Sequence, residues 1–120
     1  MERTFSKVRF VLGITLCLAP FWQTLYAGGG GITWSPYQGE MKWKEATEKC
    51  KSLGMRLPSI EELIAAYNSA VTKAWPEQGA YWSSSKYAGD YYSYWGLHSK
   101  NGIYMDNNKH YGVLYVRCVR

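Results

Sequence analysis

Two helices followed by a small twisted antiparallel sheet are the fold that this sequence predicts, which places it in the α+β class. Apolar residues recur at helical spacing in the first half of the chain, whereas apolar and polar residues alternate after Gly79. The chain has 120 residues, which is enough for one compact domain. Its hydrophobic content of 47% excludes a disordered polar tail. The 11 Tyr and 6 Trp indicate a core of rings, a ring-rich binding surface, or both.

Residues 1–27 have the pattern of a secretory signal peptide. Basic residues dominate residues 1–9, an apolar run follows over residues 10–22, and Ala27 is a small residue at the expected cleavage position. The run is shorter than the roughly 17–25 residues that span a membrane. An uncleaved anchor and a lipidated Cys17 are the alternatives. We therefore expect export to the periplasm, the cell surface or the medium, with membrane contact only through this segment.

Cleavage would leave a glycine-rich lead-in, residues 28–31, and a folded domain, residues 32–120. The net charge would fall from +5 to +3, which is too small to identify a partner. Cys50 and Cys118 would remain, and an even count in an exported protein favours one disulfide over two free thiols. We expect no metal and no other cofactor, because two cysteines and two distant histidines lack the spacing of zinc-ligand pairs.

In chain order, residues 32–34 are a short strand candidate and residues 42–53 an amphipathic helix that Gly54 ends. A second helix is expected over residues 59–73, where Ser59 and Glu62 have the spacing of a capping box. The first helix should bury Trp43, Ala46, Cys50 and Leu53, and the second Ile60, Leu63, Ile64, Tyr67 and Val71.

Four strand candidates follow, separated by Gly, Asn and Asp: residues 80–84, 92–98, 103–106 and 111–119. Alternation predicts that one set of side chains in the middle strands points inward, namely Trp95, Leu97, Ile103 and Met105. The opposite set should point outward, namely Tyr94, His98, Tyr104 and Asp106. In the last strand, one face should carry Leu114, Val116 and Cys118. We expect residues 106–108 to form a turn that connects two strands.

Several segments match a known family. These are Trp43-Lys44-Glu45-Ala46, Cys50, Arg56-Leu57-Pro58-Ser59 with Glu62-Leu63, Tyr81-Trp82-Ser83-Ser84-Ser85, and Tyr115-Val116-Arg117-Cys118-Val119-Arg120. Together they resemble the Lcl C-terminal domain family, a bacterial domain of unknown function in exported proteins. The resemblance implies a C-type-lectin-like fold, in which a disulfide joins the first helix to the last strand, here Cys50 to Cys118. It also implies a binding or adhesion module, and the founding member is linked to sulfated polysaccharides.

The stretch from Tyr87 to Tyr111 is unusually rich in tyrosine and small polar residues: 18 of its 25 residues are Tyr, Ser, Asn, Asp, His or Gly. Rings supply contact area and small polar groups supply hydrogen bonds, as in adaptable binding surfaces. A wet sheet with outward tyrosines is the alternative. The expected ligand-binding residues are Tyr87, Tyr92, Tyr94, His98, Asn101, Tyr104, Asp106, Asn107, Asn108 and His110.

Other chemistries have weaker support. Calcium needs a cluster of oxygen ligands, and the candidates here lack the motifs of sugar-binding C-type lectins: Glu77, Asp90, Asp106, Asn107 and Asn108. No catalytic Ser-His-Asp or Cys-His set can be assembled, so we do not expect an enzyme. Arg56 and Arg117 should be structural, each pairing with a carboxylate such as Glu61 or Glu62.

These observations predict an exported, non-catalytic binding or adhesion module that recognises a glycan or a cell-surface ligand. The alternative is a structural or assembly component of the envelope or of a surface appendage, where the same surface meets a protein. A minority hypothesis follows from the resemblance, because such domains serve as targets of diversity-generating retroelements, which randomise codons for Tyr, Asn, Ser, Asp and His. Nucleic acid is not an expected partner of an exported domain.

Overall fold

The computed structural model describes residues 31–120, so the predicted signal peptide and most of the lead-in lie outside the described residues. Within that range no helix is both long enough and apolar enough to cross a membrane. The elements, in chain order, are β4 (Glu40–Met41), α3 (Trp43–Ser52), α4 (Ile60–Asn68), the 3-10 helix η1 (Thr72–Ala74), β5 (Ala80–Lys86), β6 (Ser93–His98), β7 (Tyr104–Asn108) and β8 (Leu114–Tyr115). The α+β class is therefore confirmed.

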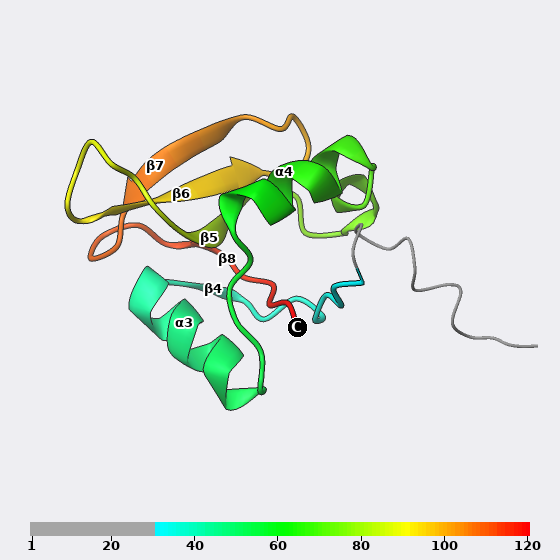
Figure 1. Cartoon of the computed structure of the whole chain (residues 1–120), viewed down its shortest axis with the longest axis horizontal. Coiled ribbons are helices and arrows are strands. Elements are labelled where there is room, and N and C mark those ends of the chain that lie inside the picture. Colours follow the sequence, from blue (N-terminus) through cyan, green and yellow to red (C-terminus); the bar gives the residue numbers. More distant parts are fainter. Residues whose placement is uncertain (1–30) are drawn as a thin grey trace, which may run out of the picture. The chain divides into compact units, whose positions relative to one another are not determined.

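The five strands form one curled sheet in the order β4-β8-β5-β6-β7. Neighbouring strands are antiparallel except β5 and β8, which are parallel where Tyr81 pairs with Tyr115. The predicted all-antiparallel sheet is wrong on this point. After β7 the chain crosses back over two strands and enters beside β5 in the direction that β7 had. The sheet is therefore mixed (Figure 1).

The first helix agrees with its prediction except at its end. Ala46 and Cys50 are buried and Trp43 is partly buried. The backbone N–H of Lys42 donates to Glu45 Oε1 at 3.0 Å, which caps the N-terminus. Leu53 was expected to point inward but is exposed, because it follows the last helical residue and the chain turns away at Gly54, where φ is +71°.

The second helix begins with the predicted capping box. The N–H of Glu62 donates to Ser59 Oγ at 3.1 Å, and the N–H of Ser59 donates to Glu62 Oε1 at 2.8 Å. Ile60 and Leu63 are buried as expected. The helix ends at Asn68, earlier than predicted, and η1 follows. Ala70 has a φ of +68°, a left-handed conformation that stops the helix.

The helices α3 and α4 cover opposite faces of the sheet, so residues 31–120 have two cores (Figure 1). Alternation along β5 sends Trp82 to the α3 side and Tyr81 to the α4 side. The α3 side contains Ala46, Cys50, Leu57, Trp82, Leu114, Val116 and Cys118, and the α4 side contains Ile60, Leu63, Trp75, Tyr81 and Leu97. The predicted Cys50–Cys118 disulfide lies in the first core and ties α3 to the C-terminal segment.

The alternation predicted for β7 has the wrong phase. Tyr104 pairs with Leu97, and Asp106 pairs with Trp95, so these four residues share one face. Ile103 and Met105, which were expected inside, are 56% and 37% exposed. The β6–β7 loop causes the shift: the N–H of His98 donates to the carbonyl of Ile103 at 2.8 Å, which places these two residues opposite each other.

The remaining strand predictions need smaller corrections. Residues 106–108 belong to β7, not to a turn, and β4 was not predicted. Residues 32–34 form no strand, and only Trp34 makes a bridge, to Val119. The last strand is limited to β8, and the chain beyond it bonds irregularly to residues 33–39 and to Arg56. Its inward residues are nevertheless as predicted, because Leu114, Val116 and Cys118 are all buried.

Candidate binding surface

Rings and lysines gather where the β5–β6 loop, the β7–β8 connection and the start of α3 meet. We call this set the aromatic–basic surface. Contacts between rings, contacts between lysines and rings, and a shared hollow connect its members: Trp43, Lys44, Lys86, Tyr91, Tyr92, Tyr94, Lys109, His110 and Tyr111.

A stacked ring pair forms the base of this surface. The rings of Trp43 and Tyr94 are nearly parallel, 15° apart, with centroids separated by 3.9 Å. The indole N–H of Trp43 donates to the carbonyl of Ser83 at 3.0 Å, which anchors α3 to β5. Tyr94 was expected to point outward, but it is partly buried against Trp43. Its ring therefore supports the surface and presents only part of its area to a ligand.

The β5–β6 loop is held by Asp90. One carboxylate oxygen accepts from the N–H of Tyr92 at 3.0 Å and the other accepts from Ser93 Oγ at 3.0 Å. The backbone bond to Tyr92 is the main reason that the pKa of Asp90 lies below its usual value. This carboxylate is committed to the loop, and the loop presents Tyr91, which is 70% exposed, beside Tyr92.

The β7–β8 connection is built in a similar way. Asn108 Oδ1 accepts from the N–H of His110 at 2.8 Å, and the carbonyl of Asn108 accepts from the N–H of Gly112 at 2.7 Å. Asn107 lies so close to Gly112 that a Cβ at that glycine would be 2.3 Å from Asn107 Oδ1. This tight turn leaves Tyr111 82% exposed.

Cations lie over the tyrosine faces. Lys86 Nζ is 4.2 Å from the ring centroid of Tyr91 and 5.6 Å from that of Tyr94. Lys109 Nζ is 5.9 Å from the ring centroids of both Tyr91 and Tyr92. An ammonium over a ring is attracted by the negative face of the π system. The lysines therefore hold positive charge within a patch of exposed rings.

Trp43 of the stacked pair lines two hollows. One is lined by Trp43, Lys44, Lys109 and His110. The other has a volume of about 310 Å³ and lies between α3, the link to α4, and the sheet. Its lining is mostly apolar with basic residues among the rings: Trp43, Thr47, Lys51, Met55, Arg56, Leu57, Ser84 and Tyr94. The region as a whole can stack on flat apolar faces and attract anionic groups.

The structure brings only part of the predicted binding set together. Tyr92, Tyr94 and His110 belong to the aromatic–basic surface, while Asn107 and Asn108 end β7 and contact the turn that follows it. Their role in binding stays a prediction. Sequence reasoning missed Trp43, Lys44, Lys86, Tyr91, Lys109 and Tyr111. Three of these lie inside the Tyr-rich stretch and could have been chosen there, whereas Trp43, Lys44 and Lys86 come from outside it and are assembled by the sheet topology.

The other predicted residues lie elsewhere. Tyr87, Trp95 and Tyr104 form a row of edge-to-face rings on the α4 side, with centroids 5.0 and 5.5 Å apart, and Asp106 shares that face. At the β6–β7 loop, His98 Nδ1 accepts from the N–H of Lys100 at 3.2 Å, and Asn101 Oδ1 accepts from the N–H of Ile103 at 2.9 Å. These two side chains shape the loop at the other end of the hairpin.

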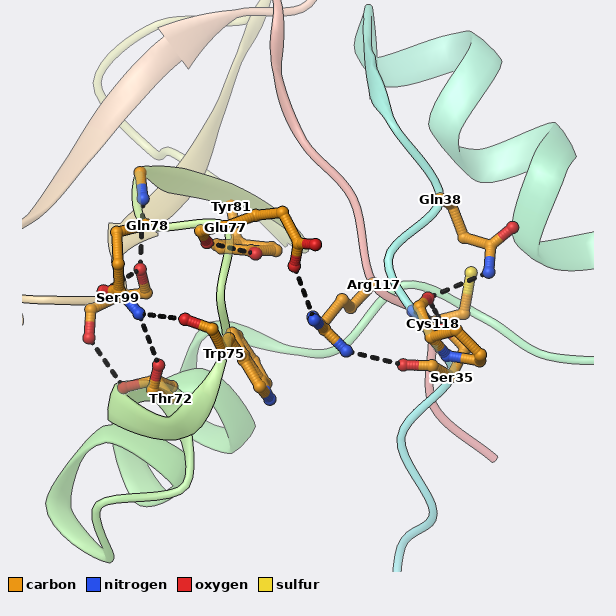
Figure 2. Close-up of polar contacts among 12 residues, drawn as sticks. Ser35, Gln38, Thr72, Trp75, Glu77, Gln78, Tyr81, Ser99, Arg117 and Cys118 are labelled. Atoms are coloured by element: carbon orange, nitrogen blue, oxygen red, sulfur yellow. Dashed lines mark hydrogen bonds and ion pairs between the residues drawn. The ribbon is translucent and has the colours of Figure 1, made fainter.

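Both arginines make structural pairs. Arg56 forms the predicted bidentate pair with Glu62, with both N···O distances 2.8 Å. Arg117, which was expected to use Glu61 or Glu62, instead donates to Glu77 Oε1 at 2.7 Å and to the carbonyl of Ser35 at 3.2 Å (Figure 2). Glu61 and Glu62 lie on α4, whereas the loop between η1 and β5 brings Glu77 to the C-terminal segment.

Gln78 and Ser99 close a second part of this network (Figure 2). Ser99 Oγ donates to Gln78 Oε1 at 2.8 Å and accepts from the N–H of Gly79 at 3.1 Å. Thr72 Oγ1 donates to the carbonyl of Ser99 at 2.8 Å. The network joins η1 to the start of β5 and the end of β6, so these polar groups are accounted for by the fold.

The candidate calcium ligands are not assembled into a site. Glu77 pairs with Arg117, Asp90 holds its loop, and Asp106 lies on the opposite face from Asn107. In the part of the chain that the structure describes, no three His, Cys, Asp or Glu side chains are grouped as a metal site would require.

One comparison with known proteins bears on the family. A family model described as "Domain of unknown function (DUF8780)" matches residues 35–118. The chain belongs to this family. The first and last matched residues are in contact, because the N–H of Cys118 donates to Ser35 Oγ at 2.8 Å. The match therefore covers a closed unit that includes α3, α4, the five strands of the described residues and the disulfide. No curated protein matches the chain.

Proposed function

We propose that this protein is an exported, non-catalytic binding or adhesion module that recognises a glycan, or another ligand on a cell surface, through its aromatic–basic surface. The observation that carries the proposal is the cluster of exposed tyrosines with lysines held over their faces. Tyrosine rings provide contact area with little loss of rotamer freedom, and they stack on the flat faces of sugars. The nearby ammonium groups favour ligands with sulfate or carboxylate groups.

The proposal extends to the wider family and the fold. We infer that the domain is C-type-lectin-like and related to the Lcl C-terminal domains. Its support is the disulfide from α3 to the C-terminal segment and the two helices on one curled sheet. Export is supported by the signal-like sequence of residues 1–27 and by the same disulfide, since such bonds persist in oxidising compartments.

The test is an array of neutral, carboxylated and sulfated glycans probed with the protein expressed from its full chain. We expect binding to acidic glycans that weakens with added salt, because exposed charges are screened. Tyr91→Ala and Lys86→Ala should each reduce binding severalfold with unchanged thermal unfolding. Lys100→Ala is the matched control, since this exposed lysine lies on the β6–β7 loop. Equal loss in the control, or no loss in either variant, would contradict the assigned surface.

The alternative is a structural or assembly component of the envelope or of a surface appendage. Exposed rings beside hollows are also typical of surfaces that meet a protein. A crosslinker placed at Tyr111→Cys in the exporting cell separates the two functions. Specific capture of one envelope protein, together with an array that shows no glycan binding, would favour the alternative.

A further inference from the structure

Strand β7 is a free edge of the sheet. In the order β4-β8-β5-β6-β7 it is paired on one side only, with β6. Figure 1 shows it as the outer strand of the β5–β6–β7 hairpins. Across residues 31–120, no strand pairs with its other side. A free edge presents backbone N–H and C=O groups that can pair with another strand.

The ladder with β6 identifies which backbone groups face outward. The N–H of His98 donates to the carbonyl of Ile103, and the N–H of Lys109 donates to the carbonyl of Tyr92, both at 2.8 Å. In an antiparallel pair, alternate residues bond to the partner strand. The odd-numbered residues from 103 to 109 therefore bond to β6. The backbone groups of Tyr104 and Asp106 point away from it.

This edge lacks most of the usual protection against pairing. Natural edge strands are blunted by proline, by charged side chains and above all by lysine, by bulges or by a covering element. The five residues of β7 include no proline and no lysine, their one charged residue is Asp106, and their register with β6 is continuous. Tyr104 and Met105 are exposed, as is Ile103 just before the strand. The edge is open and partly apolar.

We propose that β7 pairs antiparallel with β7 of a second copy of this chain, with the twofold axis through Met105. Tyr104 then lies opposite Asp106 of the second copy, and the reverse pair forms by symmetry. The hydroxyl and carboxylate of these residues provide polar, uncrowded cross-strand contacts. Met105 faces its own copy across the axis, which joins two exposed apolar side chains. Such a self-complementary contact is what a twofold dimer requires.

Other registers fit less well. Centring the axis on Asp106 would place two carboxylates directly opposite, which is destabilising. Centring it on Tyr104 would bring Asp106 opposite Gly102, which has a φ of +74° and belongs to the loop, not to the strand. Only the axis through Met105 pairs Tyr104 and Asp106, the two residues whose backbone groups are free, with each other.

The expected dimer is reversible. A five-residue edge buries less area than a standard stable interface, so association should depend on protein concentration. Tyr104 and Asp106 lie on the opposite sheet face from Tyr94, whereas Met105 shares the face of Tyr94. The dimer does not depend on the proposed function, although two surfaces on one particle would raise the avidity for a polymeric ligand.

Disulfide trapping tests the register with the protein expressed from its full chain. In this register the two copies of residue 105 lie directly opposite each other and share no backbone hydrogen bond. The Cα atoms of such a pair are about 4.5 Å apart, which is within disulfide range. We expect Met105→Cys to form a covalent dimer under mild oxidation. Ile103→Cys is the matched control, because it is more exposed yet lies opposite Asn107 in this register. Equal trapping at position 103 would mean random collision and would overturn the register.

Sedimentation velocity tests the interface without added cysteines. Wild type should shift from monomer to dimer as its concentration rises. Asp106→Pro removes an outward N–H, which edge strands tolerate, and should abolish the shift. Met105→Lys is a second variant that places two ammonium groups together at the axis and should do the same. Thermal unfolding reports whether each variant is folded. The proposal would be contradicted by a wild-type protein that stays monomeric, or by a folded Met105→Lys variant that still dimerises.

Discussion

Glu62 illustrates how one side chain can hold two neighbours at once. It caps α4 through the N–H of Ser59 and pairs with Arg56. The hydrogen bond from Arg56 is the main cause that lowers the pKa of Glu62, and the bond from Ser59 adds to it. The link between the helices is therefore fastened where the second helix begins.

Replacing this carboxylate should change the response to acid. Because the pKa of Glu62 is lower in the folded than in the unfolded protein, its contribution is present above the unfolded pKa. That contribution is lost as the pH falls through the folded pKa. Glu62→Gln should lower the free energy of unfolding by about 1 kcal/mol at pH 7, the size of a lost cap. Urea unfolding at pH 7 and pH 3 should show the difference shrinking in acid. Glu61→Gln, on the exposed side of the same turn, should show no such change.

Tyr81 should control stability in alkali. Burial raises the pKa of Tyr81 to about 12, and its hydroxyl donates to the carbonyl of Glu77 at 2.6 Å. The folded protein keeps the phenol neutral, so stability is full below the unfolded pKa near 10. Stability then falls as the pH rises toward 12. Tyr81→Phe should be about 1 kcal/mol less stable at pH 8 and should lose less between pH 8 and pH 11, measured by guanidinium unfolding. An equal loss of stability in wild type and variant would refute this assignment.

At the scale of elements, the helix ends follow from local chemistry, whereas strand phase does not. A serine followed by a glutamate three residues later forms a capping box at the start of a helix. The sequence therefore predicts the one made by Ser59 and Glu62. The phase of β7 depends on which loop residue lies opposite His98. That residue is set by the length of the β6–β7 loop, which the alternation of apolar and polar residues does not predict. The stacking of Trp43 on Tyr94 likewise requires α3 to lie on the sheet face that carries Tyr94. The candidate surface was therefore only partly predictable.

Gly96 leaves room on β6 for the side chain of Leu114. A Cβ at this position would be 2.9 Å from Leu114 Cδ1 and 3.0 Å from the carbonyl oxygen of Tyr81. Gly96→Ala should therefore lower the free energy of unfolding by about 1–3 kcal/mol, as overpacking does. The double variant with Leu114→Ala should lose less than the sum of the two single losses, because it relieves one of the two clashes. Strict additivity would show that the side chain of Leu114 is not the obstacle.

For the whole molecule, the disulfide joins parts that are distant in the sequence. Cys50 and Cys118 are 68 residues apart, and the bond lies in the core between α3 and the sheet. Residues 31–120 form two cores on opposite faces of one sheet, each with few residues. A domain this small has little apolar burial in reserve. Its stability should therefore depend strongly on the crosslink.

Removing the crosslink should be more damaging than any single change above. Closing a loop of this length contributes roughly 4 kcal/mol in the chain-entropy account. The double variant Cys50→Ala/Cys118→Ala should lose about that much in urea unfolding. Intact mass with and without reductant should differ by two hydrogens in wild type. Equal masses would show that the bond does not form in the isolated protein.

The sequence by itself determined the α+β class, both helices, the capping box, one disulfide and the identity of most buried helix residues. These depend on spacing within about one helical turn, or on the count of cysteines, so they can be read locally. The tertiary structure alone decided the parallel β5–β8 pair, the phase of β7 and the gathering of Lys86, Tyr91 and Trp43 at one end of the sheet. Each of these depends on which segments distant in the chain pack together. The spacing of residues within one segment does not predict such packing.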